Sequence, residues 1–205
     1  MTTARDLTLI ALGLPAGHSV EQGDLSLALA GAEAVDLLDH GALTLDGDRL
    51  VPGPPVETGD ALLDQAAAAL SPQEPYETVD AWLWRRGSEL AAAYADDLKR
   101  AGLLTHRTGH GLHLPFSAAT QTGSPADSPA RRAAEERRTS GEPVLTALLV
   151  AAGVGDAPSD IPDSPLEDAV TTVLAAVGDA VTQLEAVRLR QGIEDAAFDN
   201  VWRGY

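Results

Sequence analysis

The sequence predicts a mainly α-helical single domain over residues 1–205, a helical bundle that carries two short β-hairpins. The chain is long enough to bury one core, and 205 residues lie near the upper end of the usual size of one domain. Hydrophobic residues make up 44% of the chain but aromatic residues only 4%, so Leu, Val and Ala must fill the interior. Leu and Ala are strong helix formers, and the composition therefore favours helices.

Two apolar helices are expected near the start of the chain. The run Leu7 to Leu14 predicts a buried helix that ends before Pro15, because proline cannot continue a helix. Leu25 to Leu38 predicts a second buried helix, in which Gly31 and several alanines permit close contact with a neighbour. Gly41 suits the left-handed residue that follows a helix C-terminus, since glycine has no Cβ to oppose that conformation.

A β-hairpin is expected next, because the alternating run from Ala42 to Val51 contains the turn dipeptide Asp46-Gly47. Thr58 is then expected to cap a helix. The apolar residues of that helix are Leu62, Leu63, Ala66, Ala67 and Leu70. A long helix from Thr78 to Ala101 follows, with a kink expected at Gly87.

The helix–hairpin arrangement recurs in the second half of the chain. Leu98 to Thr105 leads to a Gly109/Gly111 turn and then to Leu112 to Leu114, which predicts the second hairpin. Residues 117–130 are rich in small and polar residues and predict an exposed loop.

The rest of the chain predicts two more helices. A block of mixed charge, Arg131 to Arg138, comes first, and a hydrophobic helix is expected from Val144 to Ala152. After a loop that runs through Pro165, apolar residues at helical spacing predict a last long helix. They are Leu166, Val170, Val173, Leu174, Val177, Val181 and Leu184.

The net charge and the absence of cysteine exclude several classes of function. A net charge of −17, from 31 acidic and 14 basic residues, opposes binding to polyanions except through a local basic patch. We therefore expect no nucleic-acid partner. The chain has no cysteine, which excludes disulfides and cysteine nucleophiles and favours a cytoplasmic location. The apolar run Leu7 to Leu14 is too short for a signal peptide or a membrane span, so any membrane contact is expected to be peripheral.

No motif predicts catalysis, a cofactor or a metal. His106, His110 and His113 are close in sequence, but the glycines around them argue against the helical geometry of a zinc pair. Asp60 and Asp64 form an i, i+4 pair of carboxylates, for which helix capping is the favoured role over acid–base chemistry. We expect a protein that is not an enzyme.

Three segments together resemble the Golgi phosphoprotein 3 family. They are Leu27-Ala28-Leu29-Ala30-Gly31-Ala32, the run from Asp36 to Leu45, and Thr58-Gly59-Asp60-Ala61-Leu62-Leu63-Asp64-Gln65-Ala66. The Thr-Gly-Asp-x-Leu-Leu-Asp run is the most specific of these. The match covers roughly residues 5 to 155, and the C-terminal helix resembles the family only in general character.

This resemblance implies a peripheral membrane adaptor that binds phosphatidylinositol 4-phosphate and retains glycosyltransferases in the Golgi. The tryptophan and arginine of the family's lipid pocket fall near Glu21 and Ala30, and its two helix arginines near Ser88 and Ala91. None of the four is retained, which removes charge-assisted hydrogen bonds to phosphate. The Ala/Gly/Asp-rich, Lys-poor composition is typical of a high-GC bacterium, which has no Golgi, so the adaptor role must differ there.

Two groups of residues are the candidates for membrane contact. Arg85 and Arg86, with Trp82 and Trp84, form the one basic–aromatic cluster of the sequence and are the substitute headgroup site; a solvated helix face with Trp82 in the core is the structural alternative. The resemblance also implies a hairpin that touches the membrane or supports oligomerisation. Its apolar candidates are Leu112, Leu114 and Phe116, which packing on the core would explain equally well.

Two other function classes remain open at this point. The first is a protein-binding module that binds no lipid. Its partner would be another protein or a second copy of this chain. Helix, Gly-Leu-Leu and hairpin also describe a winged helix, but residues 89–98 lack the several exposed Arg or Lys side chains of a recognition helix.

Overall fold

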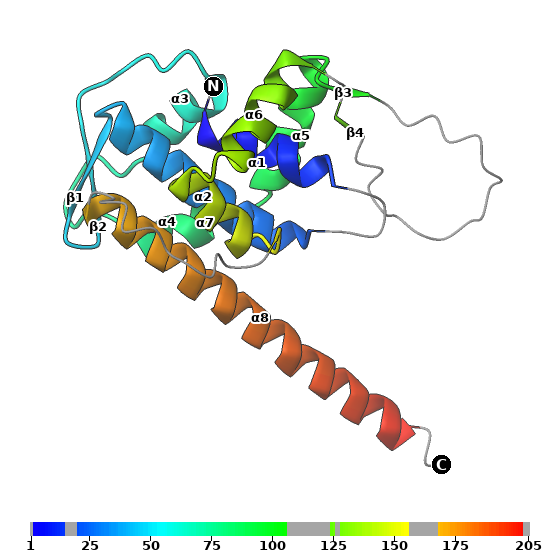
Figure 1. The fold of residues 1–205 in the computed structure, drawn as a ribbon. Coiled ribbons are helices and arrows are strands. Elements are labelled where there is room, and N and C mark those ends of the chain that lie inside the picture. Colours follow the sequence, from blue (N-terminus) through cyan, green and yellow to red (C-terminus); the bar gives the residue numbers. More distant parts are fainter. Residues whose placement is uncertain (1, 15–19, 106–123, 126–127, 156–167, 203–205) are drawn as a thin grey trace.

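The computed structural model describes residues 2–14, 20–105, 124–125, 128–155 and 168–202 (Figure 1). Within these residues the chain forms eight α-helices and two small antiparallel sheets, which confirms the mainly helical class. The helices are α1 (Thr3–Leu12), α2 (Gln22–Asp39), α3 (Ala61–Ala68), α4 (Val79–Arg86), α5 (Leu90–Arg100), α6 (Pro129–Thr139), α7 (Pro143–Ala151) and α8 (Asp168–Trp202). The sheets pair β1 (Leu43–Asp46) with β2 (Arg49–Pro52) and β3 (Leu104–Thr105) with β4 (Ser124–Pro125).

Helix α2 is the centre of the fold. Every residue from Leu25 to Leu37 is buried, and α2 packs against α1, α3, α4, α5, α7 and α8. Its Leu and Ala side chains suit this position because they are apolar on all sides of the helix. At Gly31, a Cβ would lie 2.3 Å from Val177 Cγ2, so the glycine is what lets α8 cross α2 closely.

The predictions for the first helix and the first hairpin are confirmed. Helix α1 is buried along most of its length, and the Thr2 hydroxyl accepts a hydrogen bond from Arg5 N at its amino end. Gly41 follows α2 with a φ of 67°, and β1 and β2 pair around a turn in which Gly47 has a φ of 62°.

The predicted cap of α3 is wrong by two residues. Asp60, not Thr58, is the N-cap, and its Oδ1 accepts from Leu62 N and Leu63 N at 3.0 and 3.3 Å. The Thr58 hydroxyl instead donates to Asp64 Oδ1 at 2.8 Å. Both carboxylates of the i, i+4 pair therefore have structural hydrogen bonds at the start of α3.

The long helix expected from Thr78 to Ala101 is two helices. Thr78 caps α4, but α4 ends at Arg86 and α5 begins at Leu90. Gly87 lies 3.3 Å, measured from an ideal Cβ, from Ser26 O of α2, and Glu89 adopts a left-handed conformation with a φ of 61°. The chain thus breaks at the glycine where only a kink was expected, because the corner packs closely on α2.

In the second half of the chain, the strand that pairs with β3 is not the predicted one. Strand β3 pairs with Ser124–Pro125, which lies inside the stretch predicted as a loop, and α6 begins in that stretch at Pro129. The predicted turn and the residues Leu112, Leu114 and Phe116 lie outside the described residues. Helix α7 agrees with the predicted helix from Val144 to Ala152 to within a residue.

Helix α8 is longer than its apolar stripe. Val170, Val173, Val177 and Ala180 are buried against the body, but the helix continues to Trp202 and leaves the body (Figure 1). Among the described helices, α8 alone is long and apolar enough between Asp168 and Glu194 to cross a membrane by length and composition. The buried residues of that stretch lie in its first half, where α8 packs against the body.

Candidate functional site

The four residues of the predicted basic–aromatic cluster all lie on α4, but they face different surroundings. Trp82 is fully buried, and its Nε1 donates to Ala30 O of α2 at 3.1 Å. A headgroup in solvent has no access to this ring. Trp82 is therefore a core residue. This position agrees with the structural alternative, in which Trp82 packs in the core.

Arg86 is a structural residue as well. Its Nε and Nη2 donate to the two carboxylate oxygens of Glu33 at 2.7 and 2.9 Å, and Nη2 also donates to Leu62 O. Glu33 has no solvent exposure and also accepts from the Tyr94 hydroxyl at 3.1 Å. Burial raises the pKa of Glu33, and Arg86 partly offsets this effect. The pair joins α2, α3, α4 and α5 in the interior.

The other two residues of the cluster reach the surface. Arg85 forms a bidentate pair with Glu77 at 2.8 and 2.6 Å, and its guanidinium lies 5.3 Å from the centre of the Trp82 ring. The Glu77 carboxylate raises the pKa of Arg85, which remains cationic in any case. Trp84 is 37% exposed, and its Nε1 donates to Asp80 at 3.2 Å. Arg85 and Trp84 are therefore the members of the cluster that a headgroup could contact.

A surface hollow of about 410 Å³ lies beside Trp84, where the amino end of α2, the α4–α5 corner and α8 meet. The residues that line it are Gln22, Gly23, Ser26, Leu27, Trp84, Gly87, Ser88, Glu89 and Leu184. Glu21 and Ser88, two of the four positions to which the resemblance assigns lipid-pocket residues, thus fall at or next to this hollow. The other two, Ala30 and Ala91, are buried.

The α4–α5 corner is held in place by α2. Ser26 Oγ accepts a hydrogen bond from Ala91 N at 3.1 Å, so a side chain of α2 satisfies a first-turn amide of α5. This bond fixes Ser88 and Glu89 at the rim of the hollow. Glu89 makes no side-chain capping bond, and its left-handed backbone is disfavoured for a residue with a Cβ.

One arginine approaches the hollow from α8. Arg188 Nη1 donates to both carboxylate oxygens of Asp24, at 2.8 and 3.0 Å. Gly23 makes room for this arginine, since an added Cβ would lie 2.7 Å from Arg188 Nη2. Glu21, the N-cap of α2, makes no side-chain capping hydrogen bond. The positive end of the 18-residue helix α2 therefore lies at the hollow, and Arg188, which is held by a carboxylate, lies next to Gly23 of its lining.

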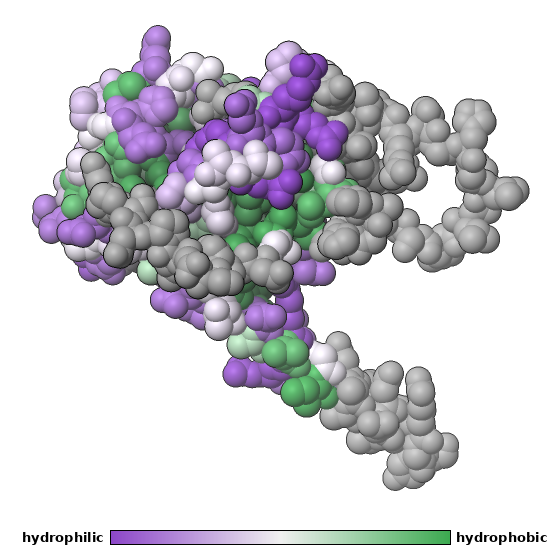
Figure 2. All heavy atoms as spheres, in the orientation of Figure 1, coloured by the Kyte–Doolittle hydropathy of each residue, from purple (hydrophilic) through white to green (hydrophobic). Residues whose placement is uncertain are grey.

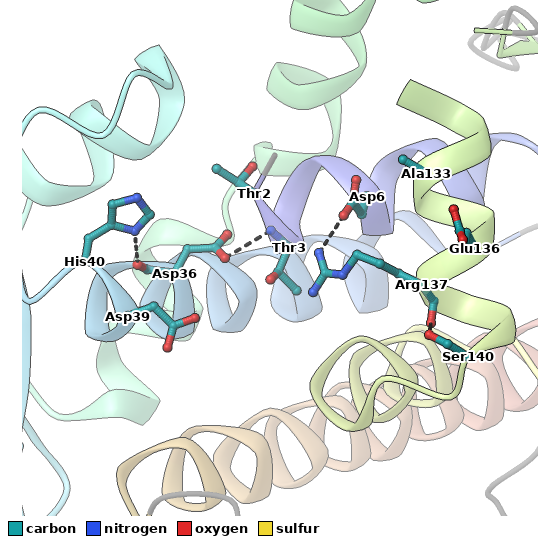
Figure 3. A pocket seen from close by; sticks show the side chains of 10 residues that line it. All are labelled: Thr2, Thr3, Asp6, Asp36, Asp39, His40, Ala133, Glu136, Arg137 and Ser140. Atoms are coloured by element: carbon teal, nitrogen blue, oxygen red, sulfur yellow. Dashed lines mark hydrogen bonds and ion pairs between the residues drawn. The ribbon is translucent and has the colours of Figure 1, made fainter. Parts of the chain in front are cut away.

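A larger hollow, of about 600 Å³, lies between α1, α2 and α6 (Figure 3). Arg137 of α6 pairs there with the buried Asp6 of α1, and Asp36 of α2 accepts from Thr3 N and Ala4 N at 3.0 and 3.2 Å. Burial raises the pKa of both Asp6 and Asp36. These contacts fasten α1 to its neighbours, so Arg137, from the predicted charge block, has a structural role that sequence reasoning missed.

No group of three or more His, Asp or Glu side chains in the described part of the chain is arranged to hold a metal ion. His106, His110 and His113 lie outside the described residues.

Fold and site together define a mainly helical protein with a surface hollow at the amino end of its central helix. The model of the Golgi phosphoprotein 3 family matches residues 4–193, which is most of the chain. The chain belongs to the Golgi phosphoprotein 3 family. The match extends into α8 as far as residue 193, beyond the span of roughly residues 5 to 155 over which the sequence motifs carried the resemblance. No curated protein matches the chain.

Proposed function

We propose that this protein is a non-enzymatic peripheral membrane adaptor that binds an anionic phospholipid headgroup of the phosphatidylinositol 4-phosphate type. The observation that supports the proposal is the hollow at the amino end of α2, because Ser88 lines it and Glu21 precedes its residue Gln22, and both are positions that the resemblance assigns to the family's lipid pocket. Trp84 at its rim is an amphipathic side chain of the kind that sits at membrane interfaces.

The headgroup chemistry rests on three groups of this chain. The amino end of α2 offers backbone N–H groups and the positive end of the helix dipole to a phosphate. Arg188 would add a charge-assisted hydrogen bond by exchanging Asp24 for the phosphate. Arg85, on the same helix as Trp84, supplies a second partly exposed guanidinium.

The charge of the protein sets the conditions for binding. With a net charge of −17, the surface as a whole repels an anionic membrane, and attraction comes only from the local cations. Ionic strength screens repulsion and attraction alike beyond the Debye length, about 10 Å at 0.1 M salt. We expect weak binding that depends on vesicles rich in phosphoinositide.

Vesicle co-sedimentation at low ionic strength tests the proposal. The protein should pellet with vesicles that contain phosphatidylinositol 4-phosphate and remain in the supernatant with phosphatidylcholine vesicles. The variant Arg85→Ala/Arg188→Ala should lose most of this binding. Lys99→Ala/Arg100→Ala removes the same charge from the far end of α5 and should leave binding unchanged. Equal loss in both variants would mean that only net charge matters and no headgroup site exists.

A protein-binding module without lipid affinity is the second candidate. It is favoured by the pairing of both partly exposed arginines with carboxylates, Arg85 with Glu77 and Arg188 with Asp24. Each pair must open before a phosphate can bind. A protein that stays in the supernatant with every vesicle composition, while remaining folded, would replace the lipid proposal with this one.

A further inference from the structure

Helix α8 presents an exposed face on the side opposite its packed stripe. We call this the outer face and define it by Ala175, Gly178, Thr182, Ala186, Leu189 and Ile193, which recur at spacings of three or four. All six residues are exposed, and Leu189 and Ile193 are 67% and 70% exposed. Figure 2 shows hydrophobic atoms on the part of α8 that leaves the body.

The outer face has small residues at one end and large ones at the other. Gly178 lies in the half of α8 that packs on the body, and a Cβ added to it would meet nothing within 4 Å. Glycine in a helix interior is destabilising relative to alanine, and no contact with the residues that the structure describes requires it here. Leu189 and Ile193 lie in the projecting half, where the chain gives them no packing partner among the described residues.

We propose that two copies of this chain pair through the outer faces of α8, with the two helices antiparallel. Leu189 and Ile193 of one copy then lie over Thr182 and Gly178 of the other, so large side chains meet small ones. In this register Arg190 lies beside Asp179 of the second copy, on the same edge of the interface. The pairing covers both projecting halves, which would otherwise stand in water without tertiary support.

The charges beside the outer face argue for a second copy rather than a membrane surface. Helices that lie in a membrane interface carry Lys and Arg along their polar face. Here Asp179, Glu185 and Glu194 accompany the exposed face, and anionic lipids would repel them. In the antiparallel register Asp179 instead lies beside Arg190 of the second chain.

The absence of native cysteine makes single-cysteine crosslinking a direct test of the arrangement. The antiparallel register is centred between Glu185 and Ala186, so Ala186→Cys should form a disulfide-linked dimer under mild oxidation. Thr182→Cys and Leu189→Cys should each stay monomeric alone but crosslink with each other when mixed. Efficient self-crosslinking of Leu189→Cys would indicate parallel helices and overturn the proposal.

Sedimentation without lipid measures the association itself. The native protein should dimerise in the micromolar range, and Leu189→Glu or Ile193→Glu should abolish the dimer. Gln191→Glu makes a charge change of the same sign outside the outer face and should leave it intact. Arg190→Asp should raise the dissociation constant about threefold, and the reversal Asp179→Arg/Arg190→Asp should restore it.

Two outcomes would overturn the proposal. One is a monomer at every concentration of the native protein. The other is a monomer whose binding to vesicles depends on Leu189 and Ile193, which would assign the outer face to the membrane.

Discussion

Side chains that a sequence marks as binding residues can be structural residues once the chain has folded. Arg86 is an example: it is one of fourteen basic residues in a strongly acidic chain, and its neighbours in the sequence, Arg85 and Gly87, suggest an exposed position. The acidic residue that neutralises it, Glu33, lies 53 positions away on α2. Sequence spacing carries no information on such a pair, whereas Arg85 and Glu77, only eight positions apart, lie close enough in sequence for local reasoning to pair them.

Arg86→Ala should destabilise the fold by about 3–5 kcal/mol, because it leaves the buried Glu33 carboxylate without its partner. Burial already raises the pKa of Glu33, and losing the arginine should raise it further. A raised folded-state pKa means that stability is present below the unfolded pKa and is lost as pH rises through the folded one. The deficit of the variant should therefore be larger at neutral pH than near pH 5, as urea unfolding would measure.

The control for this prediction is Glu33→Gln/Arg86→Met, which removes both charges. It should recover much of the lost stability, and its deficit should not grow with pH. A deficit of Arg86→Ala that is the same at both pH values would contradict the role of Glu33. Because Arg86 has this structural role, loss of lipid binding in an Arg86 variant indicates a headgroup site only if the variant is shown to be folded.

At the scale of the elements, the sequence predicts what short-range chemistry determines. The turn at Asp46-Gly47 and the glycine after α2 are where they were expected, because left-handed backbone strongly selects glycine. The predicted cap of α3 is wrong because Thr58 and Asp60 are both good N-cap residues. Which of them caps the helix depends on Arg5 of α1, whose Nε lies 2.6 Å from Asp60 Oδ2. The break between α4 and α5 depends on contact with Ser26 of α2, which no local pattern reveals.

Glu89→Gly should stabilise the fold by up to about 1 kcal/mol, because glycine adopts the left-handed backbone of this position without a Cβ clash. Ser88→Gly, at the neighbouring position where φ is not positive, should be neutral or destabilising. Urea midpoints of the two variants give the comparison. If Glu89→Gly weakens the protein, then the Glu89 side chain contributes more at the rim of the hollow than its strained backbone costs.

At the scale of the whole molecule, the burial of α2 can be predicted from its sequence, since apolar and small residues occupy most positions from Leu25 to Leu38. Its neighbours cannot, because a helix with apolar residues on every side accepts a partner on any side. The contact with α8 is set instead by the fit of Gly31 to Val177, 146 positions apart by their sequence numbers. The hollow at the amino end of α2 could not be predicted either, since it needs α8 to lie beside the α4–α5 corner.

Gly31→Ala should destabilise the protein by about 1–3 kcal/mol, because the new methyl group would lie 2.3 Å from Val177 Cγ2 and push α8 away from α2. Val177→Ala removes the obstructing methyl groups and should cost about 1–3 kcal/mol alone, through the cavity that it leaves. In the double variant the two changes should compensate, so that its loss is smaller than the sum of the single losses. Gly192→Ala, where the added Cβ meets nothing within 4 Å, is the matched control and should be neutral or mildly stabilising. Strictly additive losses would mean that α8 does not rest on Gly31, and the hollow that α8 helps to form would lose its structural basis.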